Sequence, residues 1–500
     1  MATNLTPDEI WGENVAEGRQ ADLFNRRQEA EHLIAYIESV VGRNSIREDK
    51  RAYTIAIDAR YGEGKTFFLR RLAEHLSITN PVAFIDAWAD DLSDEPLTAL
   101  AATLKAALEP FMGKPQVKSR VADFMSKSGK VAKIVGWGLV RRGAGLLLTG
   151  KAVDAAEDLL ANVSEDVKDS VDDGLKDVAQ GGVDDTAQAI GSISAQAFME
   201  KRITEFEEGK LAVQRMKDSL EAIVALLDGE QQPPIIIVID ELDRCRPTYA
   251  VKLLEEIKHL FDVPGLVFIL ALHSEQLSHS VSGAYGAGFD GRAYLKRFVD
   301  REYQLATPSL VPLLDKIYAN FETPSRAFNF PPLATATGDV DPSMPQLIAE
   351  YMKVYGLGAR DAFELMDIIQ TSIALAERQT LHVPYFLPLA IGVVKGLPPG
   401  DLPKPLRNSN WSYVPNWSIN NGDVTQMNFA DLAYAIREAV SMPGDKLRRA
   451  IEEETSDYAM RLVANNWRYN SDEPPIWTIY GYPRLMKAVA RFANPKIEKA

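Results

Sequence analysis

A lysine followed by a threonine, Lys65 and Thr66, stands at the end of a short turn that is rich in small residues. An apolar strand pattern that begins at Tyr53 precedes the turn, and an apolar helix pattern follows it. This layout is typical of a phosphate-binding (Walker A) loop, because N–H groups of the turn and of the helix N-terminus converge on an anion. We expect Lys65 to reach the β and γ phosphates of a nucleotide and Thr66 to coordinate Mg²⁺. The expected nucleotide contacts in this loop are Gly62, Glu63, Gly64, Lys65, Thr66 and Phe67.

The loop departs from the general pattern GxxxxGK[ST] at its first position, where Ala59 replaces glycine. Alanine can hold this position if its φ angle stays negative, so the departure is mild. The alternative is a chance strand and turn followed by a surface lysine. The strand before the turn and the apolar helix after it favour the phosphate loop.

A second group of candidate residues ends the apolar run from Ile235 to Ile239, which predicts a strand buried on both faces of a parallel sheet. Asp240 and Glu241 follow at its carboxyl end, as in a Walker B motif. We expect Asp240 to hold the Mg²⁺ shell and Glu241 to orient the attacking water, with Asp243 as the competing candidate for the second role. The alternative role for this carboxylate pair is a helix cap.

Two more predicted strands end in polar residues that would lie at the same edge of the sheet. Asp86 follows the run PVAFI, where it would lie near Mg²⁺ or the attacking water, or would cap a turn. His273 follows the run from Leu266 to Leu272. It would sense the γ phosphate as a hydrogen-bond donor, or make a structural hydrogen bond at the strand end.

Several arginines are candidates for neutralising charge on the transferred phosphoryl group. Arg360 opens the second of two helices predicted in a helical lid, from which it would approach the phosphates; surface capping is the alternative. A neighbouring protomer would supply a cation instead if the protein assembles, and Arg297 is the residue we assign to this catalytic role. The other candidates for this role are Arg244, Arg246 and Arg301. All four would otherwise pair with acidic residues of their own chain.

The predicted strands and helices that carry these residues indicate an α/β fold. We expect a P-loop NTPase core built on a parallel sheet, an α-helical insertion between the nucleotide motifs and a mainly helical C-terminal region. An amphipathic helix before the core carries Arg26 and Arg27, for which we expect a solvated helix face rather than a nucleotide contact. The expected domains are an N-terminal arm and helix (1–50), the core (51–113 and 202–310), the insertion (114–201), a linker and helical lid (311–380) and a Trp-containing domain (381–500).

Composition limits the classes of function. The 500 residues, 46% hydrophobic and 25% charged, suffice for two or three packed domains. The single cysteine, Cys245, excludes an internal disulfide framework and a cysteine-built metal site, so we expect a cytoplasmic protein. No secretory signal is visible in the first residues. The net charge of −15 argues against a broad nucleic-acid surface, although a local basic groove or an oligomeric channel would escape this sum.

One segment raises the question of membrane contact. The run from Val131 to Gly150 is apolar, but Arg141 and Arg142 in its middle would be costly at the centre of a bilayer, so a simple transmembrane helix is not expected. The residues up to Lys201 combine small apolar residues at helical spacing with many Asp and Gly residues. This pattern predicts an ordinary helical insertion, or else a partner-binding or peripheral, membrane-surface segment.

The order of these motifs resembles the KAP family of P-loop NTPases over roughly residues 20–310. The runs that carry the resemblance are FIDAW, IIIVIDELDRCRP, VPGLVFILALHSEQL and GRAYLKRFVDREYQL. The resemblance implies ATP hydrolysis on an additional-strand P-loop sheet, frequent membrane association, and bacterial roles in the exclusion of phages or plasmids. Ala59, His273 at a position that is commonly acidic, and the polar insertion depart from the family pattern.

The leading functional hypothesis is a switch-like ATPase whose nucleotide state controls binding to a protein effector, in a chain that forms homo-oligomers. One alternative is a nucleotide-gated scaffold that binds ATP with negligible turnover. A second is an ATP-driven nucleic-acid remodeler. ATPase activity separates the first two hypotheses, and dependence of that activity on DNA or RNA would favour the third.

Overall fold

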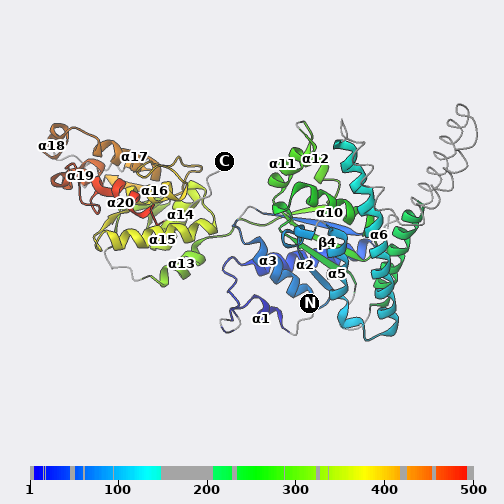
Figure 1. Ribbon diagram of the computed structural model, residues 1–500. Helices are drawn as coiled ribbons and strands as arrows, with labels where there is room; N and C mark the ends of the chain where they lie inside the picture. Colours follow the sequence, from blue (N-terminus) through cyan, green and yellow to red (C-terminus); the bar gives the residue numbers. More distant parts are fainter. Residues whose placement is uncertain are drawn as a thin grey trace, which may run out of the picture. The chain divides into compact units, whose positions relative to one another are not determined.

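The computed structural model describes residues 5–14, 16, 18–44, 51–59, 62–93, 95–147, 207–227, 233–286, 288–321, 327–335, 337–416, 425–452 and 458–492. The chain divides into two compact units (Figure 1). Unit 1 consists of Met1–Trp11, Ala30–Ala59 and Thr66–Gln304, and unit 2 of Gly12–Glu29, Arg60–Lys65 and Leu305–Ala500.

Unit 1 is built on a five-stranded parallel sheet. Its strands are β1 (Tyr53–Asp58), β2 (Val82–Asp86), β3 (Ile235–Asp240), β4 (Leu266–Leu272) and β5 (Arg301–Gln304), in the order β2-β3-β4-β1-β5. Every residue of β3 and β4 is buried, as expected for continuous apolar strands covered on both faces. Because β4 lies between β1 and β3, the sheet has the additional strand of the expected P-loop fold, and the predicted α/β class is confirmed.

Alternate residues of these strands face one hydrophobic core. Ala56, Ile237 and Leu270 belong to this core, which extends into the helices on that side of the sheet. Helix α10 packs there against both α5 and α11. The helices of unit 1 are α1 (Pro7–Trp11), α2 (Arg26–Asn44, whose first turn belongs to unit 2), α3 (Lys65–Leu76), α4 (Ala87–Asp90), α5 (Pro96–Ala107), α6 (Pro115–Leu147), a helix over 207–226, α10 (Pro247–Leu260), α11 (Ser274–Tyr285) and α12 (Gly291–Leu295).

The described part of the expected insertion begins as α6, which packs against the helix over 207–226. Asp123 accepts hydrogen bonds from the Ser219 hydroxyl, at 2.7 Å, and from the Lys127 ammonium, at 2.5 Å. Within the described residues, which include α6 as far as Leu147, no helix is long and apolar enough to cross a bilayer. The remaining residues of the expected insertion, 148–201, lie outside the described part of the chain, as do residues 202–206.

Unit 2 has a mainly helical core around α16 (Val383–Val394), all of whose residues are buried. The expected pair of helices around a glycine turn is confirmed: α14 (Met344–Tyr355) ends at Gly356, whose φ is +70°, and α15 (Ala359–Leu375) follows. The other helices are α13 (Val311–Ala319), α17 (Phe429–Val440), α18 (Gly444–Glu452), α19 (Tyr458–Asn465) and α20 (Tyr482–Val489).

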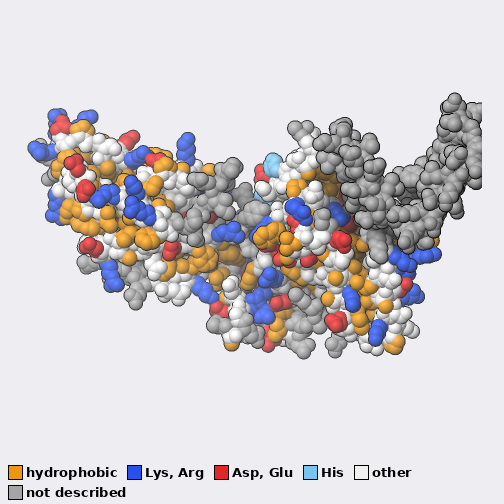
Figure 2. All heavy atoms as spheres, in the orientation of Figure 1, with side chains coloured by type: hydrophobic (Ala, Val, Ile, Leu, Met, Phe, Trp, Pro, Cys, Tyr) orange, Lys and Arg blue, Asp and Glu red, His pale blue; other side chains and the backbone are white. Residues whose placement is uncertain are grey.

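Short strands complete unit 2. They are β6 (Phe328–Asn329), β7 (Leu333–Thr335), β8 (Gly338–Val340), β9 (Leu381–His382), β10 (Ser412–Asn416) and β11 (Thr425–Met427), arranged as the sheet β11-β10-β7-β8 and the pair β6-β9. Trp411, Trp467 and Trp477 are partly buried against the core, and Trp417 lies outside the described residues. On the face drawn in Figure 2, acidic and basic side chains of the described residues are interspersed with hydrophobic ones.

Candidate functional site

Polar residues meet at the carboxyl edge of the parallel sheet in unit 1. The strand register pairs Asp58 of β1 with Leu272 of β4, and Asp86 of β2 with Asp240 of β3. Asp58 Oδ1 accepts the backbone N–H of Ser274 at 2.9 Å. Asp86 Oδ1 accepts the N–H of Ala89 at 3.0 Å and caps α4, which is the structural alternative that the sequence left open for this residue.

Asp240 and Glu241 occupy contrasting environments at the end of β3. Asp240 is only 2% exposed, and its Oδ1 accepts the N–H of Glu241 at 2.9 Å. The Glu241 carboxylate pairs with the Arg244 guanidinium at 2.9 Å. Burial raises the pKa of Glu241; Arg244 opposes this shift, while the carboxylates of Asp240, Asp86 and Asp243 add to it. Negative charge is therefore concentrated at this edge of the sheet.

The backbone of Glu241 adopts a left-handed conformation, with φ +59° and ψ +27°. Residues other than glycine, asparagine and aspartate seldom occupy this region, and such strain clusters at functional sites. The turn that follows, η4 (Leu242–Arg244), buries Asp243, which is 7% exposed. The two candidates for orienting water, Glu241 and Asp243, thus lie on one tight turn directly after β3.

The expected phosphate loop precedes α3, which begins at Lys65. Gly62 and Gly64 have φ angles of +86° and +81°, which only glycine adopts without strain. Thr66 follows Lys65 in the first turn of α3. The ring of Phe67 lies edge-on to Trp11 of α1, with centroids 6.5 Å apart, so the side chain of this expected nucleotide contact packs within the protein.

Within unit 2, the loop contacts the start of α15. A Cβ atom built on Gly62 would lie 3.4 Å from the Cβ of Arg360 and 3.5 Å from its backbone nitrogen. A Cβ on Gly64 would lie 3.4 Å from the ring of Phe24. The structure therefore brings Arg360 of the expected lid to within van der Waals reach of the loop at Gly62.

Arg26 contacts the same loop, and its environment in the structure differs from the one that the sequence predicts. It is fully buried, so the expectation of a solvated helix face is wrong for this residue. Its guanidinium donates to the carbonyl oxygens of Glu63, at 2.7 Å, and Ala306, at 2.9 Å, and pairs with Glu29. Asp22 caps the helix beneath it by accepting the Arg26 N–H at 2.9 Å. An arginine beside a second arginine in a polar stretch gives no sequence signal of burial, because its acceptors are distant in the chain.

The arginines considered for phosphoryl charge differ in their surroundings. Arg244 pairs with Glu241, and its guanidinium lies 5.6 Å from the ring centroid of Trp88. Arg246 donates to the carboxylate of Asp91 through Nε at 3.0 Å. Both therefore have acidic partners in their own chain.

Arg297 and His273 also belong to unit 1, and His273 directly follows β4 at the carboxyl edge of the sheet. Arg297 follows α12, is exposed, and lies 5.9 Å from the ring centroid of Tyr294. His273 caps α11, with its Nδ1 accepting the N–H of Gln276 at 3.2 Å. The neutral tautomer that makes this bond carries its hydrogen on Nε2. The ring can therefore still donate a hydrogen bond through Nε2 while Nδ1 makes the structural one.

Comparisons with known proteins add a family to this geometry. The model of the KAP family P-loop domain matches residues 26–313. No curated protein matches the chain. Among solved structures, the chain is similar to the Aeropyrum pernix ORC2 protein, determined as ADPNP-ADP complexes, with 14% sequence identity and a TM-score of 0.30 over 74% of this chain and 68% of that chain. The family match spans more than half of the chain and includes the sheet, the loop before α3 and the turn after β3. The chain therefore belongs to the KAP family of P-loop NTPase domains.

Proposed function

We propose that this protein binds ATP with Mg²⁺ at the N-terminus of α3, hydrolyses it, and uses its nucleotide state as a switch that controls binding to a protein effector. The observation that carries the proposal is the pair Asp240 and Glu241 at the end of β3, in a sheet whose order places β4 between β3 and β1. In P-loop enzymes the carboxylates of this turn hold the metal shell and orient the attacking water.

The donor set fits Mg²⁺. Among the side chains that the structure describes, no three or more His, Cys, Asp or Glu residues group as metal ligands. A P-loop site needs fewer, because the protein supplies one hydroxyl and one or two carboxylates while phosphate and water complete the shell. Thr66 and Asp240 would hold the ion, which neutralises phosphate charge when bound. Glu241 would accept a hydrogen bond from the attacking water, and Arg244 favours its ionised form.

Two cations complete the proposed site. Lys65 would contact the β and γ phosphates, and Arg360 at the start of α15 would approach the same phosphates past Gly62. Such a contact supports a switch, because loss of the γ phosphate removes an interaction made by a residue of another helix. The exclusion of phages or plasmids, which the family resemblance implies, is the process in which we place this switch.

One observation favours the alternative of a scaffold that binds ATP with negligible turnover. Glu241 is already engaged by Arg244 at 2.9 Å, and this ion pair competes with the orientation of water. Turnover separates the two functions: a switch-like ATPase releases phosphate in an ATP-dependent manner, and Glu241→Gln keeps ATP binding while losing about 10² fold or more in kcat. A scaffold shows no such release in the wild type.

Binding itself is tested with Lys65→Ala, measured by titration calorimetry with ATP and Mg²⁺. We expect this variant to lose measurable ATP binding while keeping its fold, because it removes the charge at the start of α3. Lys105→Ala, at an exposed lysine of α5, is the matched control and should bind like the wild type. Unchanged ATP affinity in Lys65→Ala would exclude the loop as the nucleotide site.

A further inference from the structure

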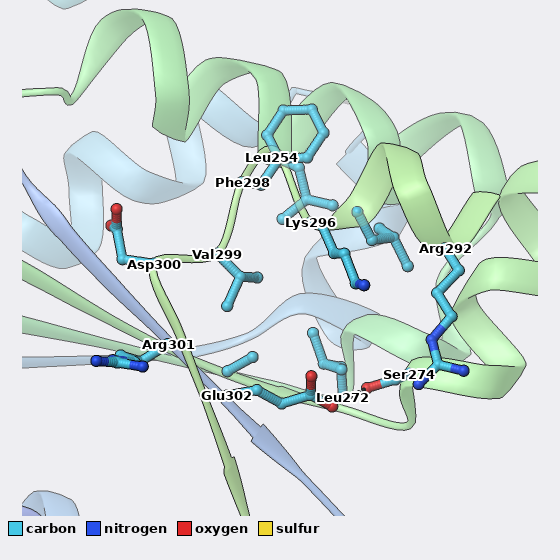
Figure 3. Close-up of a pocket in the computed structure, with 12 residues that line it drawn as sticks. Leu254, Leu272, Ser274, Arg292, Lys296, Phe298, Val299, Asp300, Arg301 and Glu302 are labelled. Carbon is cyan, nitrogen blue, oxygen red and sulfur yellow. Dashed lines mark hydrogen bonds between the residues drawn. The ribbon is translucent and has the colours of Figure 1, made fainter. Parts of the chain in front are cut away.

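A cavity of about 170 Å³ lies in unit 1, on the sheet face that α10 covers (Figure 3). Its volume is close to the roughly 150 Å³ of a cavity that admits a benzene ring. Its walls are mostly apolar and come from three directions: Ala56 of β1 and Leu272 of β4, Leu254 of α10, and Leu295, at the end of α12, with the two apolar residues that follow it. The six apolar residues are Ala56, Leu254, Leu272, Leu295, Phe298 and Val299.

The side chains of two basic residues extend towards this cavity. Arg292 of α12 and Lys296, which caps it, are four residues apart and therefore project on one side of the helical turn. Figure 3 shows the Lys296 side chain extending between other residues that line the cavity and the Arg292 guanidinium beside Ser274. Within the described part of the chain, neither side chain has an acidic partner.

The other charges around the cavity are already engaged. Asp300 accepts from Arg51 at 2.8 Å and from the backbone N–H of Thr54 at 2.9 Å. Glu302 accepts from the Ser274 hydroxyl at 3.2 Å. The Arg301 guanidinium donates hydrogen bonds to the hydroxyls of Tyr36 and Tyr53. The cavity lining therefore combines two cations that have no acidic partner among the described residues, two hydrogen-bonded carboxylates, Arg301 and an apolar wall.

We propose that this cavity binds a small organic acid whose carboxylate or phosphate lies between Arg292 and Lys296 and whose apolar body lies against Leu254 and Phe298. Unpaired cations beside an apolar surface fit an anion better than a neutral molecule, because charge-assisted hydrogen bonds are the stronger ones. A compact ring with one acidic group matches the volume. None of the lining residues is among those proposed to hold the nucleotide, so the two proposals are tested independently.

The test uses the full chain and three probes of one size and different charge: benzoate, benzyl alcohol and benzylamine, with binding measured by ligand-detected saturation-transfer NMR. We expect benzoate to bind with a Kd on the order of 1 mM or tighter and the other two more weakly. Tighter binding of benzylamine would show that Glu302 dominates the cavity and would overturn the proposal. Equal binding of benzoate and benzyl alcohol would overturn it as well.

Substitutions in the cavity lining test whether the ligand binds there. Replacing both cations, Arg292→Ala with Lys296→Ala, should weaken benzoate binding at least about tenfold. Both side chains are exposed, so the fold should persist. The matched control replaces two exposed lysines outside the cavity, Lys105→Ala with Lys118→Ala, and should bind like the wild type. Val299→Phe fills the cavity from its wall and should abolish binding; wild-type affinity in this variant or in the double cavity variant would refute the assignment.

Discussion

Replacing Arg26 with methionine should destabilise the protein by about 3–5 kcal/mol. The side chain of Arg26 is 1% exposed and that of its ion-pair partner Glu29 is 16% exposed, so methionine keeps the buried stem but removes the charge that compensates Glu29. Breaking one partner of a buried pair costs about 3–5 kcal/mol. The lost bonds to Glu63 and Ala306 carry about 1.5–3 kcal/mol each, but they do not add in full because Glu29 still accepts the N–H of Ala306 at 3.0 Å.

The assay is differential scanning calorimetry of the full chain without nucleotide. For a unit of this size, each kcal/mol corresponds to roughly 2–4 °C in Tm, so the transition that contains unit 2 should fall by roughly 6–20 °C. Arg27→Met is the matched control, because Arg27 is half-buried, adjacent, and shares the Asp22 cap through its backbone. Equal Tm values for the two variants would refute the view that Arg26 holds the loop and the residues before α13 together.

Three further outcomes follow from the site and the core. Asp240→Asn should weaken Mg²⁺-dependent ATP binding, measured by calorimetry with and without the metal, whereas Asp243→Asn should retain it; bind-without-cleavage behaviour in Asp243→Asn would transfer the water-orienting role to that residue. Burial raises the pKa of Glu256 from 4.5 to about 7, so the folded protein keeps a proton that the unfolded chain releases. Stability should therefore fall by about 3 kcal/mol as pH rises from 4.5 to 7, and Glu256→Gln should abolish this fall in Tm measured across that range. Mixing a Lys65→Ala subunit with an Arg297→Ala subunit should partly restore ATPase activity if Arg297 acts on a neighbour, and activity independent of protein concentration in a persistent monomer would leave Arg360 as the better candidate.

Four strands of the sheet, β1 to β4, could be predicted from the sequence almost residue by residue, whereas β5, a short strand with mostly exposed polar residues, could not. β4 begins and ends where its apolar run does, and β3 includes Asp240 at the end of its run. Both strands are buried on two faces, and a continuous apolar run is the direct result of that environment.

Contacts between residues far apart in the sequence could not be predicted in this way. Arg26 meets Glu63 and Ala306 only once the chain has folded, and a lone buried arginine leaves no periodic pattern. The part of the chain assigned to the linker and helical lid (311–380) contains β7, whose Leu333 is 1% exposed. Strands of two or three residues are too short to show alternation, so neither their pairing nor their burial was visible.

The way the chain alternates between the two units has a consequence for biosynthesis. Unit 2 takes Gly12–Glu29 and Arg60–Lys65 from the N-terminal part of the chain, and Leu23 and Phe24 pack against a core whose first buried residue is Leu313. About 290 residues are translated between Phe24 and Leu313, which takes roughly 15–60 s at ribosomal rates. During that interval the N-terminal strip of unit 2 has no core to join. A ribosome-bound intermediate therefore exposes these aromatic and aliphatic side chains until the end of synthesis, and no single cut of the polypeptide can yield both units intact.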